Sequence, residues 1–377
     1  MEKMIGLLTF YWADDFGAML QCFALKEYLN TYEKTVVIPY FPKALRSRYR
    51  VLYRRPNQSL RWKIAEIVKP PTVLNTINRR IKMINFRKHH FCDSNKTIAL
   101  SSEIPQCFKD IDTYVVGSDQ VWNPKITEGF QDGYFCTFKN NTKKGTRFVS
   151  YAASIGVSAF NDDCDEYFRR NLQNFDEISI REAGSKEYLL QFCKKEPICV
   201  LDPVFLLSHS QWEKQIKSIP KHNEKYIFVY CADESKELIS YTRKLAAEKG
   251  LKIYVCDNFF YQWNGNITLK NESNPFDTLS YLRDAEYVVT NSFHGLVTSI
   301  IFEKQFAVFR HSVRSERQVS LLNTVQLNSR VVTDADSFCI DEKIDYEKSK
   351  TLLDVKIKES KEFIKNKILK KECNPDF

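Results

Sequence analysis

A short polar segment, Asn291-Ser292-Phe293-His294-Gly295, separates two apolar runs near the end of the chain. The run before it is typical of a buried strand, and the run after it is typical of a helix. A histidine in the first turn of a helix lies at the positive end of the helix dipole, where anions are favoured. We therefore predict that His294 faces an anionic ligand. Asn291 and Ser292 are ordinary cap residues, and Gly295 leaves room for a ligand or another backbone segment.

A carboxylate follows another buried run, in the segment Gly117-Ser118-Asp119-Gln120. Two interpretations of Asp119 stay open. Its side chain caps the next helix, or it orients or deprotonates a hydroxyl group of a substrate. In either case the end of the preceding strand places it at the edge of a sheet.

Polar residues also follow three other apolar runs. Arg181 directly follows the alternating stretch 178–180, and a guanidinium at a buried strand end needs an anionic partner such as a carboxylate or a phosphate. Gly17 begins a helix, where backbone N–H groups can receive an anion, although an ordinary turn also explains this glycine. Asp202-Pro203 is interpreted as a structural turn between domains, because proline fixes φ there.

Apolar strands and helices alternate along the chain, as in parallel sheets that are covered on both faces. We expect an α/β protein with two Rossmann-like, doubly wound domains facing a cleft. The expected divisions are residues 1–207, which include a basic helical excursion at about 43–95, residues 208–345, and a C-terminal helix at 346–377. Ligands bind at the carboxyl ends of such strands, so the polar residues described above should converge there.

The composition is that of a globular protein, with 43% hydrophobic and 27% charged residues. No apolar run reaches the length of about 18 residues that a membrane span requires. The eleven cysteines are scattered without a C-x-x-C pair, and the first residues resemble a strand more than an export signal. We therefore expect a cytoplasmic protein in a reducing compartment. No His or Cys cluster has the spacing of a metal site, so no metal is expected.

The net charge of +9 is concentrated in one segment. From Lys43 to Lys88 there are fourteen Lys or Arg and a single acid, Glu66, which gives this segment +13 and the remaining chain −4. One interpretation is a solvated helical face. The other is an electrostatic collar for a phosphorylated substrate, or a peripheral contact with an anionic membrane at its inner face. Nucleic acid is not an expected partner, because no nucleic-acid-binding motif accompanies the basic run.

Five segments, taken in their order along the chain, resemble the polysaccharide pyruvyl transferase family: FGAMLQCFALKEYL, VVGSDQVWNP, SIREAGSKEYL, LDPVFLL and VVTNSFHGLVTSIIF. The resemblance implies a fold like that of GT-B glycosyltransferases. It also implies transfer of the enolpyruvyl group of phosphoenolpyruvate to a sugar, forming a pyruvate ketal in the biosynthesis of a cell-surface polysaccharide such as an exopolysaccharide or capsule. Phosphoenolpyruvate is then a co-substrate, and no further cofactor is expected.

The resemblance also indicates which residues carry the chemistry. Matched by motif, Asp119, Arg181 and His294 are the expected catalytic residues. Arg181 would bind the carboxylate or phosphate of the donor, while His294 and Asp119 would share the acid and base roles in an order that stays open. The expected substrate-binding residues are their motif neighbours and a later arginine: Gly17, Gly117, Ser118, Gln120, Asn291, Ser292, Gly295 and Arg317.

The chain departs from the family pattern at two positions: Phe293 stands where the family often has Arg or Leu, and Asp15 where it often has Asn. Two other classes of function also stay open. A GT-B glycosyltransferase would use a nucleotide-sugar, but the pair of glutamates eight residues apart that many retaining members carry is missing, because Glu286 is followed at that spacing by His294. The other class is a non-catalytic carbohydrate-binding protein. The sugar acceptor and its carrier, a nucleotide, a lipid diphosphate or a polymer, are equally open.

Overall fold

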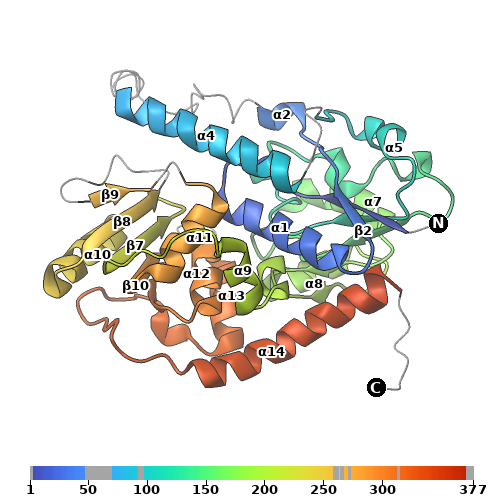
Figure 1. Cartoon of the computed structure of the whole chain (residues 1–377). Helices are drawn as coiled ribbons and strands as arrows, with labels where there is room; N and C mark the ends of the chain where they lie inside the picture. The colour runs from blue at the N-terminus through green and yellow to red at the C-terminus, as the bar shows by residue number, and fades with distance from the viewer. Residues whose placement is uncertain are drawn as a thin grey trace.

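The chain folds into two α/β units, each built on a parallel sheet (Figure 1). The computed structural model describes residues 3–46, 70–91, 97–257, 263, 267–270, 273–311 and 315–370. Part of the basic excursion, residues 47–69, lies outside the described residues.

The sheet of the first unit has the strand order β2-β1-β3-β4, with every pair parallel. A parallel pair, β5-β6, continues it through bridges from Val149 to Glu177 and from Ala153 to Ile180. The strands are β1 Met4–Leu8, β2 Lys34–Val37, β3 Thr113–Val116, β4 Arg147–Ser150, β5 Ser179–Ile180 and β6 Ile198–Cys199. The α-helices of this unit are α1 Phe16–Asn30, α2 Lys43–Arg46, α4 Pro70–His90, α5 Ile104–Cys107, α6 Pro124–Thr127, α7 Asp165–Asn171 and α8 Lys186–Leu190.

The sheet of the second unit has the order β11-β10-β7-β8-β9, again entirely parallel. Its strands are β7 Tyr226–Cys231, β8 Lys252–Asp257, β9 Ile267–Leu269, β10 Tyr287–Thr290 and β11 Gln305–Val308. Its helices are α9 His209–Ile216, α10 Lys236–Lys249, α11 Pro275–Asp284, α12 Phe293–Ile301 and α13 Glu316–Val325. The prediction of two doubly wound parallel sheets is therefore confirmed.

Helix α1 lies between the two units and is buried on nearly all sides. Asp15 caps it, with its side chain accepting a hydrogen bond from the backbone N–H of Ala18 at 2.9 Å. The aromatic rings of Phe16 and Tyr230 meet at 5.1 Å between centroids, so β7 of the second unit packs against the start of α1. The largely apolar sequence of α1 follows from this position, because a helix that meets solvent only at Lys26, Glu27 and Asn30 needs no broad polar stripe.

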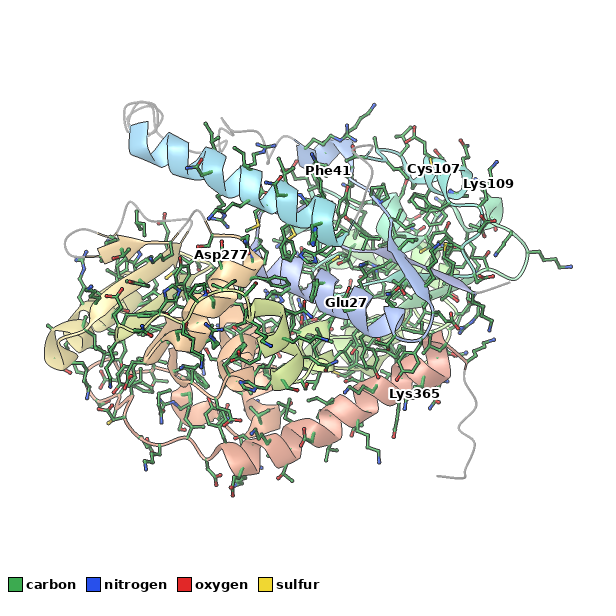
Figure 2. All side chains as sticks on the ribbon, in the orientation of Figure 1. Glu27, Phe41, Cys107, Lys109, Asp277 and Lys365 are labelled. Carbon is green, nitrogen blue, oxygen red and sulfur yellow. The ribbon has the colours of Figure 1, made fainter. Side chains whose placement is uncertain are left out.

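Helix α4, the described part of the basic excursion, lies across both units (Figure 1). Arg87 donates hydrogen bonds of 2.8 Å to the carbonyl of Trp12 and to the carboxylate of Asp14 in the first unit. Lys82 lies 3.5 Å from Asp277 of α11 in the second unit, and Figure 2 shows Asp277 close beneath α4. The excursion therefore includes a helical strap over the junction. None of the described helices is long and apolar enough to cross a membrane.

The last described helix, α14 Tyr346–Phe363, runs from the second unit back to the first (Figure 1). One turn of π-helix, Ile364–Ile368, extends it. Arg147 at the start of β4 donates to the carbonyls of Lys367 and Ile368, at 2.5 and 2.8 Å. The hydroxyl of Ser360 accepts from the backbone N–H of Leu201 at 2.9 Å. The chain therefore passes between the units twice.

Candidate active site

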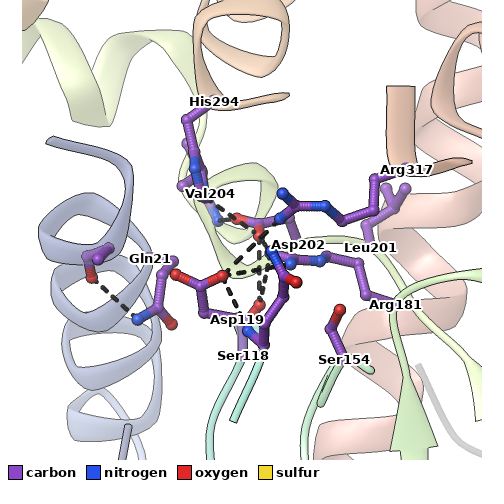
Figure 3. A network of polar contacts seen from close by, with 12 residues as sticks. Gln21, Ser118, Asp119, Ser154, Arg181, Leu201, Asp202, Val204, His294 and Arg317 are labelled. Carbon is purple, nitrogen blue, oxygen red and sulfur yellow. Dashed lines mark hydrogen bonds and ion pairs between the residues drawn. The ribbon is translucent and has the colours of Figure 1, made fainter. Parts of the chain in front are cut away.

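Polar side chains from both units meet at the carboxyl ends of the two sheets (Figure 3). Asp119 follows β3 and Arg181 follows β5 directly, while His294 lies in the first turn of α12 after β10. Two further residues, Asp202 and Arg317, connect these three into one network. The convergence predicted for the strand ends is therefore present in the structure.

Arg181 is the most deeply buried cation of this network, with a side-chain exposure of 2%. Its Nη1 donates to Asp202 Oδ2 at 2.7 Å, and its Nε lies 3.4 Å from Glu182 Oε1. Burial alone would lower the pKa of Arg181, but the negative charges of Glu182, Asp202 and Asp119 outweigh burial and raise it. The guanidinium therefore stays charged, and only its Nη2 edge is directed towards Asp119, at 3.5 Å.

Asp202 joins the two units and is fully buried. Its Oδ1 accepts from the N–H of Val204 at 3.1 Å, so it does shape the turn as predicted. Its Oδ2 contacts Arg181 and also lies 3.5 Å from His294 Nε2. Burial would raise the pKa of Asp202, but the neighbouring His294 and Arg181 hold it well below its usual value. A carboxylate in this position orients the imidazole and the guanidinium together, which the interpretation as a turn did not include.

Asp119 is the most exposed acid of the network, at 14% of its side chain. Its backbone has φ = 75°, a strained conformation for a residue with a side chain. The Oδ1 atom accepts from the N–H of Gln120 at 2.9 Å and lies 3.8 Å from Arg317 Nη1. Burial raises the pKa of Asp119, but Arg181, Arg317 and His294 together lower it further than burial raises it. Asn123, not Asp119, caps α6, so the capping interpretation is wrong.

The imidazole of His294 is buried between the two units. Ser292 caps α12 as predicted, accepting from the N–H of Gly295 at 3.4 Å. The ring lies against the backbone of Gly17 in the first turn of α1, where an added β-carbon would come within 1.9 Å of Nδ1. Nε2 has no hydrogen-bond partner among the described residues, because 3.5 Å to Asp202 exceeds hydrogen-bond length. Such a buried polar atom is expected to be completed by a ligand or by a small closing movement.

The other predicted substrate-binding residues mainly shape the site. Ser118 donates to Asp202 at 3.2 Å, and the side chain of Gln120 accepts from Asn123 at 2.8 Å. Asn291 caps none of the described helices; its side chain accepts from the N–H of Ala232 at 2.8 Å and donates to the carbonyl of Asp233 at 2.8 Å.

The glycines make room for neighbouring side chains. A β-carbon on Gly117 would lie 2.9 Å from Leu7, and one on Gly295 would lie 2.3 Å from Thr290 Oγ1. Gly17 leaves its space to His294, so the three glycines allow close packing between the elements that carry the network.

Sequence reasoning missed one polar residue of α1, Gln21, which lies beside Asp119 in Figure 3. Its Nε2 donates to Thr9 Oγ1 and to the carbonyl of Ala18, both at 2.9 Å. Its Oε1 is buried and has no hydrogen-bond partner among the described residues. An amide side chain within the apolar first three turns of α1 was the available signal. No group of three or more His, Cys, Asp or Glu in the described part of the chain is arranged to hold a metal ion.

The fold and the family follow from comparison with known proteins. The UDP-N-acetylglucosamine 2-epimerase from Neisseria meningitidis, solved with UDP-GlcNAc bound, is 10% identical, covers 98% of this chain and 100% of its own, and has a TM-score of 0.50. MnaA from S. aureus, solved with UDP, is 12% identical, covers 98% of this chain and 97% of its own, and has a TM-score of 0.50.

Both similarities concern the fold alone, which is GT-B-like. Curated proteins gave no match. The family model for polysaccharide pyruvyl transferase matches residues 15–313, which include the whole network described above except Arg317. The chain belongs to the polysaccharide pyruvyl transferase family, whose members are transferases that act on polysaccharide.

Proposed function

We propose that the protein transfers the enolpyruvyl group of phosphoenolpyruvate to a sugar and forms a pyruvate ketal in the biosynthesis of a cell-surface polysaccharide. The proposal rests on one observation above all. Asp119 and Arg181 of the first unit meet His294 and Arg317 of the second in a single buried network at the strand ends. Family membership supports the same reaction class. The reaction uses phosphoenolpyruvate as a co-substrate and calls for neither a metal nor another cofactor.

Two guanidinium groups are proposed to bind the anionic donor. Arg181 Nη2 and Arg317 Nη1 both point at the same oxygen of Asp119, at 3.5 and 3.8 Å. These distances are long for ion pairs, and Asp119 is partly exposed, so a carboxylate or phosphate of the donor can displace it from the pair. Arg181 is held from behind by Asp202 at 2.7 Å, which fixes the direction of its free edge.

Ketal formation requires two hydroxyl groups of the sugar. C3 of the donor gains a proton, and the first hydroxyl adds to C2 and loses its own. Phosphate then leaves from C2 as the second hydroxyl attacks and releases its proton. His294, oriented by Asp202, is assigned to the proton of C3 or of the leaving phosphate, and Asp119 to the acceptor hydroxyl. Each acid–base role contributes about 10²–10⁴ in rate.

The donor itself would activate the base. While Asp119 faces two arginines its pKa is held low, which makes it a weak proton acceptor. An anion of the donor that occupies both arginines removes much of this stabilisation, so the pKa of Asp119 rises when the donor binds. The base is therefore expected to become effective only in the donor complex.

The acceptor is proposed to be a sugar linked to a nucleotide or to a lipid diphosphate. Two proteins of the same fold were solved with UDP or UDP-GlcNAc, and a diphosphate would suit the basic excursion.

The basic excursion is also proposed to contact an anionic membrane. On α4, Lys82 and Lys88 are exposed to solvent, whereas Arg87 donates a hydrogen bond to the carbonyl of Trp12. Replacing Lys82 and Lys88 with Gln should weaken binding to anionic vesicles, measured by sedimentation, by roughly thirtyfold, at about 1 kcal/mol per cation. Unchanged sedimentation would remove the proposed membrane contact.

The decisive experiment measures phosphate release from phosphoenolpyruvate with a panel of sugars, and detects the ketal methyl group by NMR. We expect release only with the correct acceptor, and a loss of at least about 10²-fold in His294→Ala. His209→Ala is the matched control, because His209 is 55% exposed on α9 and contacts no residue of the network. Consumption of a nucleotide-sugar without phosphoenolpyruvate would instead indicate the glycosyltransferase. Glycan binding that persists in His294→Ala, without any turnover, would indicate a binding protein.

A further inference from the structure

The aromatic ring of Phe293 contacts both arginines of the site. Arg181 Cζ lies 4.9 Å from the ring centroid and Arg317 Cζ lies 5.2 Å from it, which are cation–π distances. Phe293 is the first residue of α12 and is 7% exposed. Since Arg181 comes from the first unit, the ring also forms part of the junction between the units.

Two guanidinium groups that share one oxygen repel each other, and something must compensate for that repulsion. A carboxylate such as Asp119 does so, but it also cancels positive charge and competes with an incoming anion. An aromatic face attracts cations through its quadrupole and carries no formal charge. A ring therefore keeps two arginines together while it preserves their attraction for an anionic ligand.

We propose that Phe293 is a positioning residue that holds Arg181 and Arg317 side by side as an anion clamp and thereby sets the affinity for the phosphorylated donor. The identity of that donor rests on the function proposed above. The clamp itself requires only a small anion with a carboxylate or phosphate group. Phe293 touches no reacting atom in this mechanism and acts through the two arginines.

The test uses substitutions that separate shape from quadrupole. Phe293→Leu removes the ring, and Phe293→Tyr keeps it. Trifluorophenylalanine at position 293 keeps the shape and abolishes most of the negative potential of the ring face. Calorimetry with phosphoenolpyruvate and with inorganic phosphate gives the affinities, and steady-state assays give KM and kcat separately.

We expect Phe293→Leu and the fluorinated variant to weaken phosphoenolpyruvate binding about tenfold, because the position no longer offers either guanidinium the negative face of an aromatic ring. The KM for the donor should rise by more than kcat falls, and Phe293→Tyr should stay within about twofold of the wild type. A ring that merely filled space would tolerate fluorination. Wild-type affinity in the fluorinated protein would overturn the inference.

A matched control lies at the other end of the same helix. Phe302 is the C-terminal cap residue of α12 and is 8% exposed. Its ring packs against His209 at 5.2 Å between centroids, so Phe302→Leu removes a comparable ring that does not contact the arginines. It should lower the melting temperature as Phe293→Leu does and leave donor binding unchanged. Wild-type protein that binds phosphate but not phosphoenolpyruvate would overturn the proposed function alone, and the clamp would then be judged on phosphate. Protein that binds neither anion would overturn both.

Discussion

The imidazole of His294 lies directly on the bare Cα of Gly17, so that a β-carbon at Gly17 would come within 1.9 Å of Nδ1. The histidine belongs to the second unit and the glycine to the first turn of α1 in the first. The orientation of His294 therefore depends on how closely the two units approach each other. A glycine is required here by the imidazole and not by its own backbone conformation, since its φ is ordinary for a helix.

Gly17→Ala should displace the imidazole and reduce kcat by about 10²-fold, the usual cost of moving a catalytic group by 1 Å. The melting temperature should fall, because displacing a buried ring costs about 1–3 kcal/mol, more than the roughly 1 kcal/mol that Ala gains over Gly in a helix. Steady-state kinetics and thermal unfolding measure the two effects. In the His294→Ala background no ring obstructs the new methyl group, so there Gly17→Ala should only stabilise. A variant with full activity would show that the position of His294 does not matter.

Asp202→Asn should lower kcat by about 10²–10⁴-fold, because the amide no longer holds His294 and Arg181 with a negative charge. The change also leaves a buried guanidinium less compensated, at a cost of up to about 3–5 kcal/mol in unfolding free energy. Kinetics and urea unfolding test both. Ser118→Ala is the control, since it removes the 3.2 Å hydrogen bond to the same oxygen and the 3.3 Å hydrogen bond from Arg181 Nη1, but no negative charge. Equal losses in the two variants would contradict an electrostatic role for Asp202.

Asp119→Asn should separate binding from turnover. The amide keeps the shape of the side chain but no longer competes for Arg181 and Arg317, so phosphoenolpyruvate should bind more tightly. Turnover should fall by about 10²–10⁴-fold, because the acceptor hydroxyl loses its base. Calorimetry and phosphate release measure the two effects, with Gln120→Ala as a neighbouring control. Weaker donor binding in Asp119→Asn would mean that Asp119 supports the anion site and does not occupy it.

Acid should weaken the attachment of α4. Burial, aided by the nearby charges of His89 and Lys26, lowers the pKa of His90 to about 4 from 6.5. The ring packs 4.4 Å from Phe86 and 5.2 Å from Phe276 of α11. Below pH 6.5 the unfolded chain takes up a proton that the folded chain refuses, so stability is lost as the pH falls from 6.5 to about 4.

The melting temperature of His90→Phe, relative to the wild type, should therefore rise as the pH is lowered from about 7.5 to about 5. Phe276→Leu disturbs the same cluster without a titrating group, so its difference from the wild type should not change with pH. A difference for His90→Phe that is equally independent of pH would contradict the assignment.

The sheets were predictable because parallel strands buried on both faces leave continuous apolar runs in the sequence, as in β3 and β10. The strand ends could be predicted for the same reason: Arg181 directly follows its strand, and Asp119 and His294 stand within four residues of the ends of β3 and β10. The position of helix α4 across both units could not be predicted. It depends on contacts of Arg87 and Lys82 with carbonyl and carboxylate groups far away in the sequence, and such contacts leave no local pattern.

Asp202 could be only half predicted. Its capping bond to Val204 is local and was visible in the Asp-Pro pair, but its contacts with Arg181 and His294 span sequence separations that no periodicity encodes. The contacts of Phe293 could not be predicted either, because the sequence shows only an apolar residue at the start of a helix. Its proposed role depends on Arg181, which belongs to the other unit and lies over its ring.

The return of α14 to the first unit has a mechanical consequence. If a single chain segment joined the two units, the second unit could rotate about that point in any direction. Two connections, one at the segment after β6 and one through α14 anchored by Arg147, define an axis and permit essentially one rotation about it. Any opening that admits substrate should then be a hinge motion about this single axis. Cutting α14 near its middle would permit rotations about other axes without changing a catalytic side chain.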